Sequence, residues 1–380
     1  MAYQEKRNKY IIKKSYYVNR TTQPSDLPAR NLNPDAPTFK FTPKATIDDI
    51  DKKIVSDNKV LSKYFSKYLD KDTVVFSDKD YLNYYVILNL NNFLKNNLSI
   101  STLCLNKCDI NYMLCNKLIN SMLHKGIKTL LVFIPNQEND MNKENDMNKE
   151  NGMNKENDMS SKILDEMSKN NSIIELTLSI NQEVISSSDL ITKLDILFEN
   201  NKTLKTFNSR GLCNINKYSP EMGDKNSLAT NNTLESLEFS YNTIMNESRA
   251  YMLKYIFHAL LNNSITTLNL SYNYMNNNEL KYLMLALKNN NTVKHLDISY
   301  NLITSYGITY ITDMLKTNSS LISLNLDNNL IDDLSVYLLC TTLYGNVTLT
   351  KLSINNTYLT ESGYNTIMKT LMDNHYLPNF

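Results

Sequence analysis

The sequence contains no tryptophan and only 7 glycines among its 380 residues. With so few glycines it holds no candidate for the glycine-rich loops that bind nucleotide phosphates. Its 5 cysteines form an odd and scattered set, which fits reduced thiols better than a disulfide framework.

Long apolar runs and an excess of one charge are also missing. No stretch approaches the roughly 20 apolar residues that span a bilayer, and the first thirty residues lack the apolar core of a secretory signal. The formal net charge is +1, which gives no whole-protein field for nucleic acid or an anionic membrane. We therefore expect a cytoplasmic location, no direct nucleic-acid partner and no membrane partner.

Asparagine is over-represented, at roughly one residue in seven against a much lower ordinary usage. We interpret this excess as the codon bias of an AT-rich genome. On that interpretation, the many N-x-S/T matches carry almost no glycosylation signal.

Two segments differ in composition from the rest. Residues 1–44 hold nine basic side chains, three acids and five of the 8 prolines, so this arm carries +6 and the remainder −5. Proline denies backbone hydrogen bonds, and we predict a disordered, basic, proline-rich arm over residues 1–45. A six-residue Glu/Asn/Asp/Met/Lys repeat from Glu138 to Met159 fits neither helix nor strand period. It predicts a disordered low-complexity insertion over residues 137–160.

A longer repeat, L-x-x-L-x-L-x-x-N-x-I, organises the rest of the chain. The nine residues at its fourth position are Leu103, Leu130, Leu176, Phe207, Leu237, Leu268, Leu296, Leu324 and Leu352. Their sequence numbers are nearly evenly spaced, except that the step from Leu130 to Leu176 is longer by about 18 residues, which the insertion accounts for. Such a period is the sequence signature of a solenoid.

Each copy alternates apolar residues as a short strand does, then turns at an Asn, then continues with helical spacing such as Ile308, Ile311 and Leu315. The pattern resembles the leucine-rich repeat family in its ribonuclease-inhibitor-like subtype. This resemblance implies an α/β curved solenoid, or horseshoe, of about nine strand-helix repeats over residues 100–376. Residues 46–99 would form a small helical N-terminal cap and a degenerate first repeat, with Phe76 as the counterpart of Leu103.

No residues suggest catalysis. The four histidines lie in different repeats, and none has a metal ligand at helical spacing. His295, Asp297 and a serine such as Ser271 or Ser299 share the strand face, but serine there is ordinary repeat consensus. We therefore expect no enzyme, no cofactor and no metal site.

The concave strand face is the predicted protein-binding surface. The repeat register places several columns outward on it, including Ser240, Ser271 and Ser299. The predicted site residues are Tyr241, Tyr272, Tyr300, Glu238, Asn269, His295, Asp297, Asn325 and Asp327. Tyrosine is enriched where proteins meet, although the string Ser-Tyr-Asn is also ordinary consensus in this repeat subtype.

The arm contains a short motif within RNLNPDAPTFKF, residues 30–41. Leu32, Asn33, Ala36 and Phe39 resemble the core of the PAM2 peptide, which binds the MLLE domain of cytoplasmic poly(A)-binding protein. The sequence departs from that peptide at Phe41, where proline is usual. Alternatively, Leu32 and Phe39 fasten the arm to the cap.

These features favour a monomeric, non-enzymatic scaffold that binds a protein client on its concave face and possesses an adaptor motif for poly(A)-binding protein. The alternative is a cytoskeletal or axonemal scaffold whose basic arm binds an acidic polymer. A regulator resembling the Ran-GTPase-activating proteins is a remote third, since that family shares the repeat subtype.

Overall fold

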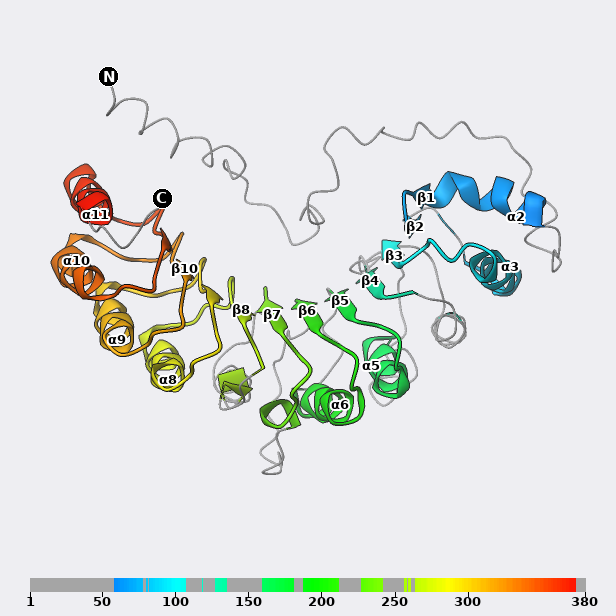
Figure 1. Cartoon of the computed structure of the whole chain (residues 1–380), viewed down its shortest axis with the longest axis horizontal. Helices are drawn as coiled ribbons and strands as arrows, with labels where there is room; N and C mark the ends of the chain where they lie inside the picture. Colours follow the sequence, from blue (N-terminus) through cyan, green and yellow to red (C-terminus); the bar gives the residue numbers. More distant parts are fainter. Residues whose placement is uncertain are drawn as a thin grey trace, which may run out of the picture.

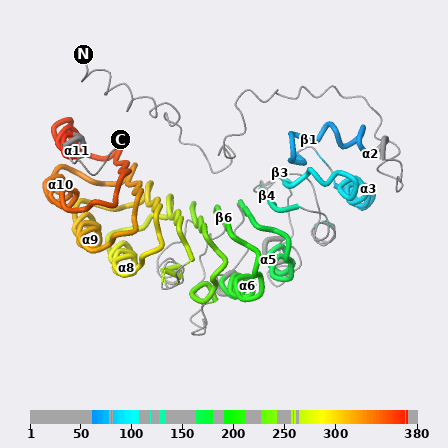
Figure 2. The backbone as a smooth tube through the Cα atoms, viewed as in Figure 1, coloured from blue at the N-terminus to red at the C-terminus, as the bar shows by residue number. Residues whose placement is uncertain are grey.

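The computed structural model describes residues 58–77, 80, 82–106, 118, 127–134, 159–180, 187–211, 227–241, 256–257, 259–260 and 264–373. They form one sheet of 11 strands in which sequence order is spatial order, β1 to β11. Figure 1 shows the strands lining the inner side of an open arc and the helices covering its outer side, and the tube in Figure 2 follows the same arc. The protein is therefore an α/β solenoid with a leucine-rich repeat fold, as predicted.

The N-terminal end of the arc is a small aromatic cap. It comprises α2 (Asn58–Phe65), the 3-10 turn η2 (Ser66–Tyr68), β1 (Leu69–Asp70), β2 (Thr73–Phe76) and α3 (Tyr84–Lys95). Phe65 stacks on Phe93 with ring centroids 5.0 Å apart, and Tyr68 lies 4.7 Å from Phe76. These contacts cover the open end of the sheet, where the solenoid core would otherwise meet water.

The remaining strands are β3 (Thr102–Asn106), β4 (Thr129–Ile134), β5 (Glu175–Ile180), β6 (Thr206–Arg210), β7 (Ser236–Ser240), β8 (Thr267–Asn269), β9 (His295–Asp297), β10 (Ser323–Asn325) and β11 (Lys351–Ser353). The outer side carries α5 (Met159–Lys169), α6 (Ser187–Asn200), η4 (Ser227–Ala229), α8 (Asn277–Lys288), α9 (Ser305–Leu315), η5 (Asp333–Ser335), α10 (Val336–Gly345) and α11 (Glu361–Asp373). Within the described ranges no helix is both long and apolar enough to cross a bilayer.

The sheet register follows the repeat. Leu103 pairs with Leu130, and each later fourth-position residue pairs with its neighbour as far as Leu324 with Leu352. The long step in the repeat leaves this register unchanged, since Leu130 pairs with Leu176. The insertion lies between β4 and α5, mostly outside the described residues, and its predicted last two residues belong to α5.

The first repeat was predicted two residues out of register. Val74, not Phe76, pairs with Leu103, and Phe76 pairs with Leu105. Both side chains are fully buried, so alternation alone does not tell the fourth position from the sixth. The cap, predicted to be helical, also contains a strand pair, because Leu69 pairs with Val74 in an antiparallel hairpin.

A row of buried asparagines lies between the outer helices and the strands that follow them. Its members are Asn170, Asn201, Asn231, Asn290, Asn318 and Asn346, which are 0–6% exposed. In Asn290 the side-chain oxygen accepts from the backbone N–H groups of Thr292 and Val293, at 3.0 and 2.8 Å, and Nδ2 donates to the Leu260 carbonyl at 2.8 Å. Codon bias is therefore an incomplete explanation of the asparagine excess, since these residues bond backbone groups that lie out of water.

The asparagine of the repeat forms a second buried row, Asn273, Asn301 and Asn329. The Asn301 amide donates to the carbonyls of Leu270 and Ile298, both at 3.0 Å, while its oxygen accepts from the Met275 N–H at 2.9 Å. Its bond to Ile298 lies within its own bend, as the sequence pattern predicts, and its bonds to Leu270 and Met275 also connect it to the preceding repeat. The predicted Asn242 lies outside the described residues.

Candidate protein-binding surface

The C-terminal half of the concave face carries a column of polar residues. Each lies one residue after the fourth-position leucine of its repeat, which we call the marker leucine. Its members from β7 to β10 are Glu238, Asn269, Asp297 and Asn325, all partly exposed. The residues that precede the marker leucines are Ser236, Thr267, His295 and Ser323, and among these His295 is exposed. The structure thus places these predicted site residues on one continuous face.

On β8, β9 and β10 the column residue is the last residue of its strand, whereas Glu238 lies inside β7. Strands β8, β9 and β10 are three residues long, and each column oxygen then accepts the N–H two residues on. The distances from the backbone nitrogen to the side-chain Oδ1 are 2.9 Å for Ser271 to Asn269, 2.9 Å for Ser299 to Asp297 and 3.0 Å for Asp327 to Asn325. These turns replace the ladder hydrogen bonds that the short strands lack.

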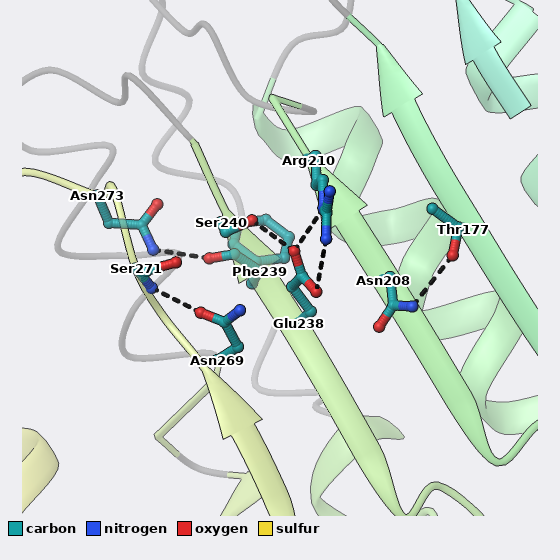
Figure 3. Close-up of polar contacts among 9 residues, drawn as sticks. All are labelled: Thr177, Asn208, Arg210, Glu238, Phe239, Ser240, Asn269, Ser271 and Asn273. Atoms are coloured by element: carbon teal, nitrogen blue, oxygen red, sulfur yellow. Dashed lines mark hydrogen bonds and ion pairs between the residues drawn. The ribbon is translucent and has the colours of Figure 1, made fainter. Parts of the chain in front are cut away.

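The carboxylates of the face differ in whether a basic side chain neutralises them. Figure 3 shows Arg210 against Glu238, with Nε and Oε1 2.6 Å apart, and the Ser240 hydroxyl also donates to Glu238 at 2.8 Å. Asp297 and Asp327 accept only from neutral groups, and neither is paired with a lysine or arginine of the described chain. Two carboxylates without a described basic partner therefore lie towards the C-terminal end of the face, where Lys351 of β11 is also exposed.

Arg210 was not among the predicted site residues, because the copy that begins at Leu204 is irregular. Arg210 lies three residues after the marker Phe207, and this spacing could have identified it as a residue of the face. The β6–β7 register confirms the position, since Arg210 pairs with Ser240. Both charged side chains are mostly buried, at 21% and 12% exposure. The pair therefore belongs to the floor of the face rather than to its rim.

The three predicted tyrosines form a continuous stack where the strands end. The ring centroids of Tyr241 and Tyr272 are 4.0 Å apart and those of Tyr272 and Tyr300 are 3.9 Å apart, with interplanar angles of 14° and 12°. Their backbone φ angles are 58°, 58° and 53°, in the left-handed region. The equivalent residues of neighbouring repeats are Gly211, Asn328 and Asn356, and these residue types enter that region most readily.

The stack is partly shielded from water. Burial, followed by the interaction of its hydroxyl with those of Tyr300 and Tyr241, raises the pKa of the Tyr272 phenol above its ordinary value. The phenol is therefore neutral at physiological pH, and the stack presents ring surface and hydroxyl groups without charge.

The serine columns were predicted to be outward, and this is wrong. Ser240, Ser271 and Ser299 are 0%, 6% and 4% exposed, because the chain turns inward as it enters the left-handed residue. The Ser299 hydroxyl donates to Asp297 at 2.6 Å. Among the described residues, no three His, Cys, Asp or Glu side chains lie close enough to hold a metal ion.

The concave face is apolar on β2, β3 and β4, which the sequence prediction missed. The column positions on β2, β3 and β4 hold Val75, Cys104 and Leu131, and Phe133 lies two residues further along β4. Cys104 is 5% exposed, and burial raises the pKa of its thiol to about 11. The apolar column residues of the first repeats can be recognised in the sequence once the register of these repeats is known.

The comparisons with known proteins are distant. No protein-family profile and no curated protein sequence matches the chain. Among solved structures, an internalin from Listeria monocytogenes is 14% identical, covering 83% of this chain and 93% of its own, with a TM-score of 0.38. Actin-binding site 2 of leiomodin-1 is 21% identical over 39% of this chain and 84% of its own, with a TM-score of 0.35.

The C-terminal domain of a Caenorhabditis elegans tropomodulin is 13% identical over 40% of this chain and 94% of its own, with a TM-score of 0.34. Scores this low support no conclusion about function. The leucine-rich repeat fold of this protein rests instead on its own register of paired marker residues along one sheet.

Proposed function

We propose that the protein is a non-enzymatic interaction scaffold whose concave face binds a protein client along the polar column and the tyrosine stack. The observation that carries this proposal is the stack itself. Placing a bulky L-residue in the left-handed region costs on the order of 1 kcal/mol, and neighbouring repeats use asparagine there instead. Tyrosine in that position in three successive repeats gives the fold no net gain over asparagine, because the ring stacking only offsets the backbone strain. The rings do offer a partner contact area at low entropic cost.

The chemistry of the face favours a client with basic and flat side chains. Asp297 and Asp327 carry charges that no described lysine or arginine neutralises, so lysine or arginine of a client would complement them. The edges and hydroxyl groups of Tyr241, Tyr272 and Tyr300 would contact planar or apolar groups beside those charges.

The double variant Tyr272→Asn, Tyr300→Asn tests this function. Asparagine already occupies the equivalent left-handed positions at Asn328 and Asn356, so the variant should keep the fold while losing the rings. We expect it to lose proteins that the wild-type chain captures from cytosol. The matched control is Tyr337→Asn, which removes an 82% exposed tyrosine from outer helix α10. If both variants capture the same proteins as wild type, the proposed client surface is wrong.

The same proposal gives the arm an adaptor role towards poly(A)-binding protein. Residues 30–41 lie outside the described residues, so this part rests on the PAM2-like spacing of Leu32, Asn33, Ala36 and Phe39. We expect the full chain to bind an isolated MLLE domain and Phe39→Ala to abolish that binding. Phe41→Ala, at the position that departs from the motif, should bind as wild type does. Absence of binding by the wild-type chain would rule out the adaptor role.

A cytoskeletal scaffold is the second candidate, supported by the charge of +6 on residues 1–44. Such an arm would suit an acidic polymer such as the tails of tubulin. Removing the charges of Lys13 and Lys14 with glutamine should then reduce co-sedimentation with microtubules while leaving MLLE binding intact. The reverse pattern would favour the adaptor.

We further assign the repeats to the ribonuclease-inhibitor-like subtype. The last four markers recur with a period of about 28 residues, at the long end of the range for leucine-rich repeats. Helices of 10 to 13 residues lie between these markers and after the last one, which also supports the assignment. We retain the division into an arm at 1–45, a cap with the first repeat at 46–99 and repeats at 100–376, and we shorten the insertion from 137–160 to 137–158 because α5 begins at Met159.

A further inference from the structure

A second exposed surface lies where the last four strands pass into their helices. Tyr274, Leu302, Leu330 and Tyr358 hold the same place in successive repeats and are 53%, 40%, 37% and 69% exposed. At the start of the next helical segment, Tyr306 is 63% and Leu334 87% exposed. We name this surface the loop ridge, comprising Tyr274, Leu302, Tyr306, Leu330, Leu334 and Tyr358.

The loop ridge is held by a backbone ladder. The backbone N–H of Leu302 donates to the carbonyl of Met275 at 2.9 Å, and the N–H of Leu330 donates to the carbonyl of Ile303 at 2.8 Å. Tyr358 continues the ladder to Ile331 at 2.8 Å. The apolar side chains are therefore presented by a fixed backbone, and an apolar patch of this kind marks a contact surface.

The loop ridge is also acidic. Asp333 and Glu361 are exposed beside it and Asp332 is partly exposed, and none of the three is paired with a lysine or arginine of the described residues. Asp332 caps η5 through the Leu334 N–H at 3.0 Å, which fixes its carboxylate. The sequence places no lysine or arginine between Lys316 and Lys351 or between Lys351 and Lys369. A ligand for this surface should therefore be basic and should carry apolar groups.

The chain itself contains such a segment. Its first 20 residues hold six basic side chains and one acid, a net +5, together with four tyrosines and the pair Ile11 and Ile12. We infer that residues 3–20 of the same chain bind along the loop ridge, with their lysines and arginines facing Asp332, Asp333 and Glu361. Their tyrosines and isoleucines would cover the exposed leucines and tyrosines of the ridge.

The connecting chain is long enough for this contact. Helix α2 begins at Asn58 at one end of the arc, and the loop ridge lies near the other end, beside α8 to α11 (Figure 1). The nine strand steps from β2 to β11 cover about 43 Å along the sheet, at about 4.8 Å each. The roughly 25 residues from Arg20 to Ala45, before the predicted cap, can extend to about 82 Å, so the segment can reach the ridge of its own chain.

Zero-length carbodiimide cross-linking of the full chain, read by peptide mass spectrometry, tests the inference. We expect amide links from Lys6, Lys9, Lys13 and Lys14 to concentrate on Asp332, Asp333 and Glu361 rather than on carboxylates elsewhere, such as Asp165 and Glu199. Their yield should fall several-fold between about 0.05 and 0.5 M salt, because the screening length shortens. Links spread evenly over the solenoid, or no arm links at all, would overturn the inference.

Two controls make the result specific. Leu334→Ser removes an 87% exposed leucine from the ridge, and Leu98→Ser removes a 78% exposed leucine from the opposite end of the arc. The first should lower the yield of ridge links several-fold, whereas the second should leave it unchanged. Equal yields from both would overturn the inference.

Cross-linking an equal mixture of ¹⁵N-labelled and unlabelled chains identifies the source of the arm. Links within isotopically uniform pairs support binding to the same chain. Links that join labelled to unlabelled peptides at the random ratio would overturn it, since the arm would then come from a second copy.

Discussion

A side-chain amide both donates and accepts, so a single asparagine can bond a helix end and the next strand together. Asn290 does so with three short hydrogen bonds to backbone groups, while its neighbour Asn291 is exposed. Asn290 and Asn291 have the same residue type but differ in burial. Comparing them therefore distinguishes asparagines that stabilise the fold from those that do not.

We predict that Asn290→Ala lowers the free energy of unfolding by about 2–4 kcal/mol, since it leaves buried N–H and C=O groups without partners. Asn291→Ala should stay within about 0.5 kcal/mol of wild type. Urea unfolding followed by circular dichroism measures both. Equal effects of the two substitutions would contradict the assigned role of the buried row.

The tyrosine stack gives a prediction about pH. Because burial raises the pKa of Tyr272, the folded state retains the phenolic proton at a pH where the unfolded chain, with a pKa of about 10, loses it. The stability from this group is therefore complete below about pH 10 and is lost as the pH rises above that value.

We predict that Tyr272→Asn changes the free energy of unfolding by less than about 1 kcal/mol at pH 7, because relieved backbone strain offsets the lost stacking. Between pH 9 and pH 11, wild type should lose more stability than the variant, as measured by urea midpoints. Parallel pH curves for the two proteins would show that Tyr272 is not shielded as described.

Between elements, a Cβ would clash at Gly363 of α11, against the Asp333 carboxylate, and at Gly307 of α9. A Cβ at Gly307 of α9 would lie 2.5 Å from Asn277 Oδ1 and 2.9 Å from Leu280 Cδ2, both on α8. At Gly345, the last residue of α10, a Cβ would meet nothing within 4 Å.

We predict that Gly307→Ala destabilises the protein by about 1–3 kcal/mol, because α9 must move away from α8. Gly345→Ala should be neutral or stabilise by up to about 1 kcal/mol, through helix propensity and a less flexible unfolded chain. Thermal unfolding of both variants compares the two cases. A loss of stability from Gly345→Ala similar to that from Gly307→Ala would contradict this account.

The repeat predicted the sheet well because every strand must bury its marker residue against the next one, as Leu296 does against Leu268 and Leu324. It predicted the tyrosine column but not its left-handed backbone, which arises where the chain leaves the sheet. The repeat does separate Leu302, at a variable position and 40% exposed, from the adjacent Ile303, at its last apolar position and 0% exposed. It could not fix the register of the first repeat, because Val74 and Phe76 are both fully buried.

At the scale of the whole solenoid, the pairing register between neighbouring strands does not depend on the length of the loops that connect the repeats. Thr129 to Ile134 of β4 pair with Glu175 to Ile180 of β5 despite the intervening insertion. A short loop joins β8, which ends at Asn269, to α8, which begins at Asn277. The connection from Ile134 at the end of β4 to Met159 at the start of α5 is much longer, yet the strands on either side of it pair in the same way.

We predict that deleting residues 139–156 leaves the fold intact. The deletion gives Leu130 and Leu176 the same spacing as the last four markers, and it leaves a β4–α5 connection close in length to the one between β8 and α8. Since loop-closure entropy grows only logarithmically with length, stability should change by less than about 1 kcal/mol. Urea unfolding and circular dichroism of the shortened chain measure this. A loss of several kcal/mol or of cooperativity would mean that the insertion packs on the repeats and is part of the folded solenoid.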